Sequence, residues 1–339
     1  MRRLALLLLL TFPVVAQVNE TITVERILVD ARVTDGRGNP ILDLAPADFR
    51  VRVDGKPAKV ESVDWIPDSA EARDLMPAPE ITSTTDIPLP PPPRGRLLIY
   101  LFQNDFARNH VRLQGHMKTL AVADSWLDWL EPEDRVAVFT FDSHLKFLLD
   151  FTSNKAQIRN AMDQSLYTDE PPPPPVVPNP SLKRHLDPEA MRAAKNPDGG
   201  MILIAQALSS IPGPKSLILF GWGLGRLQRD RVVMDRNYGA ARQMLEASRV
   251  SVFSVDFTEA DSHSLEVGLQ QVAADTGGFY TKANYFPKLA AERLQKTLAG
   301  HYELEVRKPE TKVRGAHTIE VDVNRRGADV MARSTYVDK

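Results

Sequence analysis

The stretch Arg96-Leu-Leu-Ile-Tyr-Leu-Phe102 decides the fold of this chain. It is an uninterrupted apolar run, and it ends abruptly in the polar cluster Gln103-Asn-Asp-Phe-Ala-Arg108. A continuous apolar run bounded by turn signals is typical of a strand that is buried on both faces of a parallel sheet. Open α/β sheets bind their ligands where such strands end. The polar cluster therefore predicts a binding edge.

Downstream of this run, strand patterns alternate with helical patterns. We expect strands over residues 135–141, 145–151, 216–220, 250–257 and 278–281. We expect helices over residues 111–130, 154–164, 201–211, 231–249, 264–275 and 287–299. Strands that alternate with helices imply right-handed crossovers and a mainly parallel sheet covered on both faces. The predicted fold class of this region is therefore α/β.

Both ends of the chain change to an alternating apolar and polar pattern, which is typical of antiparallel strands with one wet face. Each end has too few strands to bury a face well alone, so we expect the two to pair in one β-sandwich. The predicted organisation is a signal peptide over 1–16, an N-terminal β unit over 17–76, a proline-rich linker over 77–95, an α/β domain over 96–300 with a proline-rich inserted loop over 165–198, and C-terminal strands over 301–339.

The composition excludes several functional classes. The 42 basic and 44 acidic side chains give a formal net charge of -2, so we expect no nucleic-acid partner. The chain has no cysteine, which excludes disulfides, a thiol nucleophile and a thiolate metal site. No nucleotide or other cofactor motif stands in a suitable context, so we expect no cofactor.

The first residues predict export. Met1-Arg-Arg precedes an apolar segment over residues 4–16, which Pro13 interrupts and which ends at Ala16. This segment is shorter than the ~20 residues that span a bilayer, so it resembles a cleaved signal peptide more than an anchor. We expect a bacterial periplasmic or secreted protein without stable membrane insertion after cleavage.

Several motifs, taken in order, resemble those of a von Willebrand factor type A domain: Glu131-Pro-Glu-Asp-Arg-Val-Ala-Val-Phe-Thr-Phe141, Leu148-Leu-Asp-Phe-Thr152 and Lys215-Ser-Leu-Ile-Leu-Phe220. Upstream, Val33-Thr-Asp-Gly-Arg-Gly-Asn-Pro and Leu44-Ala-Pro-Ala-Asp-Phe-Arg-Val-Arg-Val-Asp-Gly55 are similar to the opening of the acidobacterial VWFA-related domain family. The resemblance implies a Rossmann-like α/β domain that binds another protein.

The resemblance also implies a metal-ion-dependent adhesion site, whose intact form carries Asp-x-Ser-x-Ser, a later Thr and an Asp. Mg²⁺ prefers such hard oxygen ligands. In this chain the Asp position of the first motif holds Gln103, its two Ser positions hold Asp105 and Ala107, and the other two positions hold Met201 and Trp222. The resemblance therefore implies a degenerate metal site with Asp105 as a weak remnant.

Our leading hypothesis is a non-enzymatic protein that binds an unidentified protein partner through this edge. The predicted partner-binding rim consists of Gln103, Asn104, Asp105, Phe106, Arg108, Met201, Trp222 and Arg226. Two residues keep alternative interpretations. Asp105 could instead cap the helix that follows it. Trp222 could anchor a partner, or it could fold back over Phe102 or Met201.

Two other functional classes stay open. A hydrolase would use a cluster of titratable groups at the same edge, with Asp105, Asp142 and His144 as candidates. A structural component of the cell envelope would use the α/β domain only as a spacer.

Overall fold

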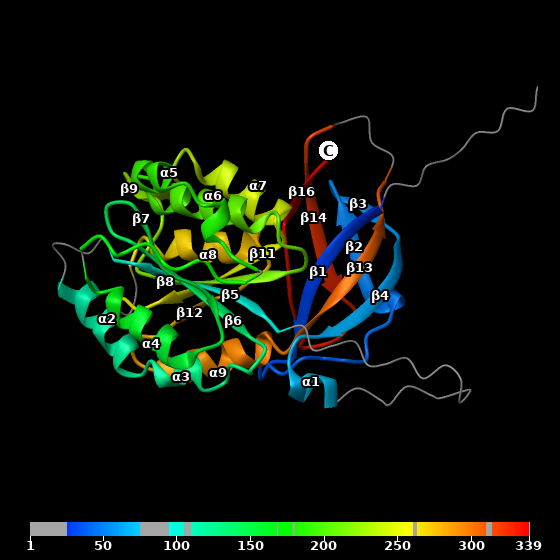
Figure 1. The fold of residues 1–339 in the computed structure, drawn as a ribbon. Helices are drawn as coiled ribbons and strands as arrows, with labels where there is room; N and C mark the ends of the chain where they lie inside the picture. The colour runs from blue at the N-terminus through cyan, green and yellow to red at the C-terminus, as the bar shows by residue number, and fades with distance from the viewer. Residues whose placement is uncertain are drawn as a thin grey trace, which may run out of the picture.

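The computed structural model describes residues 26–74, 95–104, 110–167, 169–178, 180–259, 263–309 and 314–338. The predicted signal peptide and nearly all of the predicted linker lie outside these ranges. A six-stranded sheet with the order β12-β11-β8-β5-β6-β7 forms the centre of the larger part of the molecule (Figure 1). Its strands are β5 (Leu97–Gln103), β6 (Arg135–Phe141), β7 (Leu145–Thr152), β8 (Lys215–Gly221), β11 (Val250–Asp256) and β12 (Tyr280–Lys282).

Strand β5 lies in the middle of this sheet and pairs in parallel with β6 and β8. Tyr100, for example, lies opposite Val138 on one side and Ile218 on the other. Its residues from Leu98 to Phe102 are buried, as the apolar run predicts for a strand covered on both faces. Only β7 is antiparallel, at one edge of the sheet.

Helices cover both faces of the sheet (Figure 1). One face packs against α2 (His110–Ala121), α3 (Asp124–Leu127), α4 (Lys155–Gln164) and α9 (Pro287–Thr297). The other face packs against α6 (Pro197–Leu208), α7 (Tyr238–Ala247) and α8 (Glu266–Asp275). Successive β5 side chains alternate between these two cores. The predicted α/β fold class is confirmed.

Two helix predictions were wrong in their extent. The stretch expected as one helix over 111–130 is divided into α2 and α3, and this division lets the fully buried Trp126 pack edge-on against Phe220, 5.0 Å away. The stretch expected as a helix over 231–249 begins with β10 (Arg231–Val233), which pairs with β9 (Arg226–Gln228) as a hairpin. Hairpin hydrogen bonds take up the backbone groups there, so the helix starts only at Tyr238.

The proline-rich insertion packs against the α/β domain and contains two short helices, η2 (Lys183–His185) and α5 (Pro188–Ala193). Asp150 on β7 accepts hydrogen bonds from Ser181 Oγ at 2.6 Å and from Leu182 N at 2.9 Å. Leu182 itself is fully buried in the core. None of the helices in the described ranges is both long and apolar enough to cross a membrane.

The two ends of the chain build a separate pair of antiparallel sheets with the orders β15-β1-β13-β4 and β16-β14-β2-β3. N-terminal β1 pairs with C-terminal β13, and β2 pairs with β14, so both sheets combine strands from both ends. One shared core joins the sheets. The elements of this β-sandwich are β1 (Arg26–Thr34), η1 (Pro46–Asp48), β2 (Phe49–Val53), β3 (Lys56–Ala58), β4 (Val60–Pro67), α1 (Ala70–Asp74), β13 (Gly300–Arg307), β14 (Ala316–Val323), β15 (Asp329–Ala332) and β16 (Thr335–Val337).

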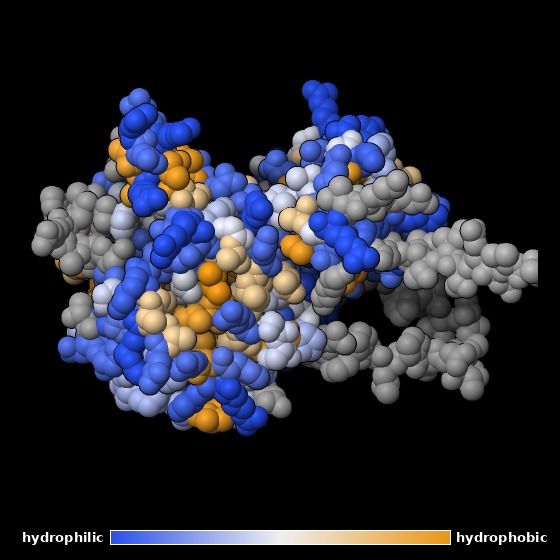
Figure 2. Space-filling model, turned by 90° about the horizontal axis from the view of Figure 1, so that it is seen from above, coloured by the Kyte–Doolittle hydropathy of each residue, from blue (hydrophilic) through white to orange (hydrophobic). Residues whose placement is uncertain are grey.

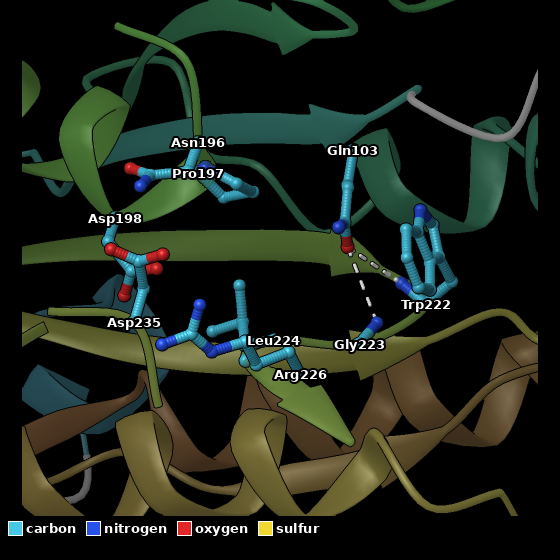
Figure 3. A pocket seen from close by; sticks show the side chains of 10 residues that line it. Gln103, Asn196, Pro197, Asp198, Trp222, Gly223, Leu224, Arg226 and Asp235 are labelled. Atoms are coloured by element: carbon cyan, nitrogen blue, oxygen red, sulfur yellow. Dashed lines mark hydrogen bonds between the residues drawn. The ribbon is translucent and has the colours of Figure 1, made fainter. Parts of the chain in front are cut away.

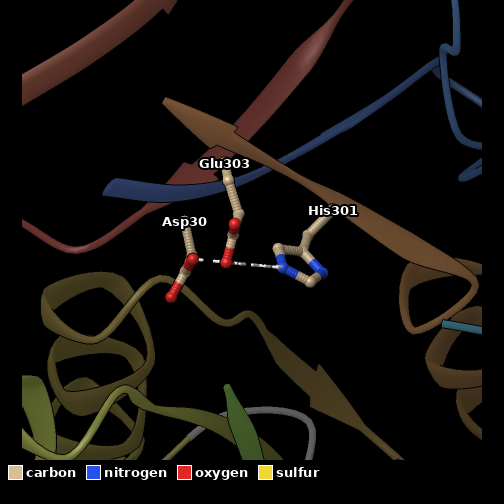
Figure 4. Close-up of side chains that lie close together, drawn as sticks. All are labelled: Asp30, His301 and Glu303. Atoms are coloured by element: carbon tan, nitrogen blue, oxygen red, sulfur yellow. Dashed lines mark ion pairs between the residues drawn. The ribbon is translucent and has the colours of Figure 1, made fainter. Parts of the chain in front are cut away.

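The β-sandwich lies against the end of the central sheet at which the parallel strands begin (Figure 1). Arg249, which directly precedes β11, donates from Nε to Asp30 Oδ2 at 2.9 Å and also pairs with Glu303. Asp30, His301 and Glu303 point toward one another from β1 and β13 (Figure 4). Because the β-sandwich covers this amino end, the carboxyl ends of the strands lie at the far end of the molecule.

Candidate functional site

A cavity of about 100 Å³ lies at the carboxyl end of the central sheet (Figure 3). Four segments meet there: the end of β5, the start of α6, the loop after β8 and the segment before α7. The lining residues are Gln103, Asn196, Pro197, Asp198, Trp222, Gly223, Leu224, Gly225, Arg226 and Asp235. The predicted binding edge therefore contains a cavity.

Gln103 holds the loop that follows β8 against the end of β5. Its Oε1 accepts hydrogen bonds from Trp222 N at 3.0 Å and from Gly223 N at 3.3 Å (Figure 3). Gly223 has a φ of 156°, and a Cβ there would lie 2.5 Å from the Cβ of Leu265. Only glycine fits such a close approach. The hydrogen bonds to Gln103 and the close packing of Gly223 against Leu265 together fix the loop that carries Trp222.

Asp198 and Asp235 form the acidic side of the cavity (Figure 3). Asp198 lies in the first turn of α6, which begins after the cap Asn196, whose side chain accepts from Gly199 N at 2.8 Å. The Asp198 side chain is 2% exposed, and its Oδ1 makes no hydrogen bond within the described part of the chain. Burial, together with the negative charge of Asp235, raises the pKa of Asp198 to about 6.

The described residues of the predicted rim differ in how exposed they are. Trp222 is partly buried against the core that contains Phe102, and Arg226 is exposed. Met201 is fully buried, and Asn104 is buried and donates from Nδ2 to Ser165 O at 2.7 Å. These last two support the edge from beneath and do not form its surface, because helix and strand packing turn them inward.

The remaining three predicted rim residues, Asp105, Phe106 and Arg108, lie outside the described residues.

The described residues at the positions that the resemblance assigns to metal ligands do not fit Mg²⁺. The amide oxygen of Gln103 already accepts two backbone N–H groups. Met201 and Trp222 offer a thioether and an indole, which are poor partners for a hard cation.

Next to the cavity, Asp256 at the end of β11 takes part in a second polar cluster. His263 Nε2 lies 2.8 Å from Asp256 Oδ2, and the hydroxyl of Tyr280 donates to the same oxygen at 2.8 Å. Lys282 Nζ lies 2.9 Å from Glu266 Oε2. This cluster could offer three ligand atoms to a metal, but Lys282 already supplies a positive charge to it.

For the hydrolase alternative, the structure brings together other residues than the predicted set of Asp105, Asp142 and His144. Asp142 pairs with Lys146 Nζ at 2.6 Å; burial raises the pKa of Asp142, but the bonds from Lys146 and from Ser143 N lower it below its usual value. Ser143 Oγ lies 3.0 Å from His144 Nδ1, and His144 Nε2 lies 3.0 Å from Glu170 Oε2. Ser143 and His144 lie on the hairpin turn between β6 and β7, and Glu170 reaches His144 from the proline-rich insertion.

The sequence interpretation missed the acidic pair. Asp198 directly precedes the Gly199-Gly-Met201 segment that the resemblance singled out, so its position was visible, but nothing marked it as buried. Asp235 fell inside the wrongly predicted helix. Only the packing of α6 beside α7 brings the two carboxylates together.

No family model and no curated protein sequence matches this chain. Among solved structures, a von Willebrand factor type A protein from Catenulispora acidiphila is similar, with 8% identity, a TM-score of 0.42, and coverage of 94% of this chain and 75% of that one. BatB from Bacteroides thetaiotaomicron gives 13% identity, a TM-score of 0.40, and coverage of 60% and 98%.

The PilB minor pilin from Streptococcus sanguinis gives 11% identity, a TM-score of 0.37, and coverage of 62% of this chain and 64% of that one. The chain thus spans just under two thirds of the pilin. These likenesses assign no function to the chain.

Proposed function

We propose that this protein is an exported, non-enzymatic module that binds another protein through the carboxyl edge of its α/β domain, without a metal bridge. The observation that carries the proposal is the cavity beside Trp222, whose buried carboxylate Asp198 has an oxygen without a hydrogen-bond partner. Buried polar groups are normally satisfied, and one that has no protein partner is available to a water, an ion or a bound group.

The position of the cavity supports the same proposal. The β-sandwich occupies the opposite end of the sheet, so a partner can approach the carboxyl edge without displacing it (Figure 1). Trp222 presents a partly buried indole on the cavity wall, and tryptophan is enriched among the residues that dominate binding energy. Figure 2, which views the molecule from above Figure 1, shows apolar and hydrophilic residues interspersed over that face, and this mixture does not mark it as an interface.

Site-specific photo-crosslinking tests the proposed surface. A photoreactive amino acid at Arg226 should give a crosslinked partner in the source cells, whereas the same group at Lys56, on the β-sandwich, should not. Trp222→Ala should reduce the Arg226 crosslink at least tenfold, as expected for a tryptophan anchor. Crosslinking from Lys56 alone, or an unchanged yield in the Trp222 variant, would place the partner elsewhere and leave the α/β domain as a spacer.

The proposed export and the proposed degenerate metal site have their own tests. N-terminal sequencing of the mature protein should begin at Gln17, directly after the predicted cleavage point. Calorimetric titration with Mg²⁺, Mn²⁺ and Ca²⁺ should show no saturable binding at millimolar concentrations. A stoichiometric heat with any of the three would contradict binding without a metal bridge.

A serine hydrolase is the second candidate, and the Ser143–His144–Glu170 chain is the observation that favours it. Ser143 is exposed and Glu170 is 60% exposed, so water competes for these hydrogen bonds. We therefore expect no labelling by a fluorophosphonate probe. Labelling that Ser143→Ala abolishes would establish the hydrolase instead.

A further inference from the structure

The acidic pair shares its cavity with the side chain of Arg226 (Figure 3). Neither Asp198 nor Asp235 makes an ion pair within the described residues. Among the described residues, Asp235 Oδ1 accepts a hydrogen bond from Asn237 N at 3.2 Å, and Asp198 Oδ1 has no donor. Two neighbouring carboxylates of which one is buried repel each other, and this repulsion favours any cation that enters between them.

The remaining walls of the cavity set the shape of the ligand. Pro197 borders the acidic side, and Leu224 and Trp222 continue the lining away from it (Figure 3). A volume of about 100 Å³ accommodates a small charged group with a short apolar stem. Lysine buries its methylene stem along apolar surface and presents a compact ammonium with three donors at its tip.

We propose that this cavity binds the ammonium group of a lysine side chain from the protein partner, between the carboxylates of Asp198 and Asp235. The proposal rests on the proposed function and specifies its chemistry. The ammonium donates to Asp198 Oδ1 and to the Asp235 carboxylate, while the stem lies along Leu224 toward Trp222. The recognition is therefore the reverse of a metal-bridged capture of a partner's carboxylate.

The donor set favours an ammonium over a divalent metal ion. Mg²⁺ requires about six oxygen ligands in near-octahedral geometry. Two further side-chain oxygens line the cavity, but Gln103 Oε1 accepts from the loop and Asn196 Oδ1 accepts from Gly199 N. The two carboxylates that remain would leave most of an Mg²⁺ octahedron to water, so a titration with Mg²⁺ is needed to separate the two ligands. The same two carboxylates are sufficient for the donors of one ammonium.

Arg226 also lines the cavity, and its side chain carries the same positive charge as the proposed ligand. Its side chain is exposed on β9 and makes no ion pair with the acidic pair. A positive charge at the mouth repels an incoming ammonium. The variant Arg226→Gln should therefore bind the amine two- to fivefold more tightly than the unchanged protein.

The experiment uses n-butylammonium as the probe and the indole N–H signal of Trp222 as the reporter in a two-dimensional ¹H–¹⁵N NMR spectrum. Trp222→Phe identifies the signal. We expect a saturable shift with n-butylammonium chloride and none with n-butanol, which has the same stem without the charge. Asp198→Asn and Asp235→Asn should each weaken binding at least tenfold. The matched control is Asp230→Asn, which removes a charge from the neighbouring hairpin turn outside the cavity and should leave the affinity unchanged.

Three outcomes overturn the assignment: an equal shift with n-butanol, retained binding in both acidic variants, or a saturable response to Mg²⁺ without one to the amine. A control spectrum of each variant shows whether it is folded. If the Arg226 crosslink to the partner persists while the amine response is absent, the proposed function survives and the lysine assignment alone fails. If the amine binds but no crosslink forms, the proposed function fails instead.

Discussion

The two ends of the central sheet both gather carboxylates, but the acidic pair in the cavity at the carboxyl end lacks the ion pairs that the carboxylates at the amino end make. At the amino end, Asp30 and Glu303 share Arg249, and the buried His301 donates from Nδ1 to Asp68 Oδ2 at 2.7 Å. At the carboxyl end, Asp198 and Asp235 have no such partner in the described chain. Compensated charge accompanies a permanent contact within the molecule, and uncompensated charge is expected where a ligand supplies the missing cation.

The largest expected effect concerns the compensated end. Arg249→Ala leaves Asp30 and Glu303 facing each other and should lower the free energy of unfolding by about 3 kcal/mol. Urea denaturation measures this as a lower midpoint with an unchanged slope. Arg226→Ala removes an arginine without an ion pair and should change stability by less than about 0.5 kcal/mol. Equal losses in the two variants would remove the contrast between the two ends.

The pH dependence of His301 should be nearly as large. Burial alone lowers the pKa of His301, but Asp68 and Glu303 raise it to about 9, above the ~6.5 of an unfolded chain. The stabilisation from this proton is fully present below pH 6.5 and is lost as pH rises through 9.

Between these limits the loss should amount to about 3 kcal/mol of unfolding free energy. Denaturation of His301→Asn across the same pH range should show a flatter profile, whereas His185→Asn, at a histidine outside this cluster, should keep the original slope. A His301→Asn profile that falls as steeply as that of the unchanged protein would contradict the assignment.

Substitution at the uncompensated end should change stability in the opposite direction, although both groups lose stability as pH rises. Because the pKa of Asp198 is raised to about 6, its carboxyl destabilises the folded chain increasingly as pH rises from about 4 through 6. Asp198→Asn should therefore raise the free energy of unfolding at pH 8 by about 1–2 kcal/mol. Thermal unfolding at pH 8, with Asp230→Asn as the control, checks the sign. Destabilisation by Asp198→Asn would mean that the charge is compensated in the folded protein.

Much of the fold could be predicted because it follows from local patterns. The apolar run of β5 and the alternation of strands and helices predicted a mainly parallel sheet, and the alternating ends predicted paired antiparallel sheets. The hairpin β9–β10 was missed, since Arg231-Val-Val233 is too short to distinguish a strand from the start of a helix. The turn residue Arg229, with a φ of 57°, gave no signal of its conformation.

The site, like the fold, could be predicted only where it follows from local patterns. By itself, the sequence predicted the edge at which we propose that a ligand binds, because a buried parallel strand must end at an edge and the polar residues after Phe102 mark that edge. Only the tertiary structure decided what the edge can bind. It turned Met201 into the core, bound the oxygen of Gln103 to the loop, and placed Asp198 beside Asp235 without an ion pair to either among the described residues. Burial and electrostatic pairing depend on distances between residues far apart in the chain, and no local pattern encodes those distances.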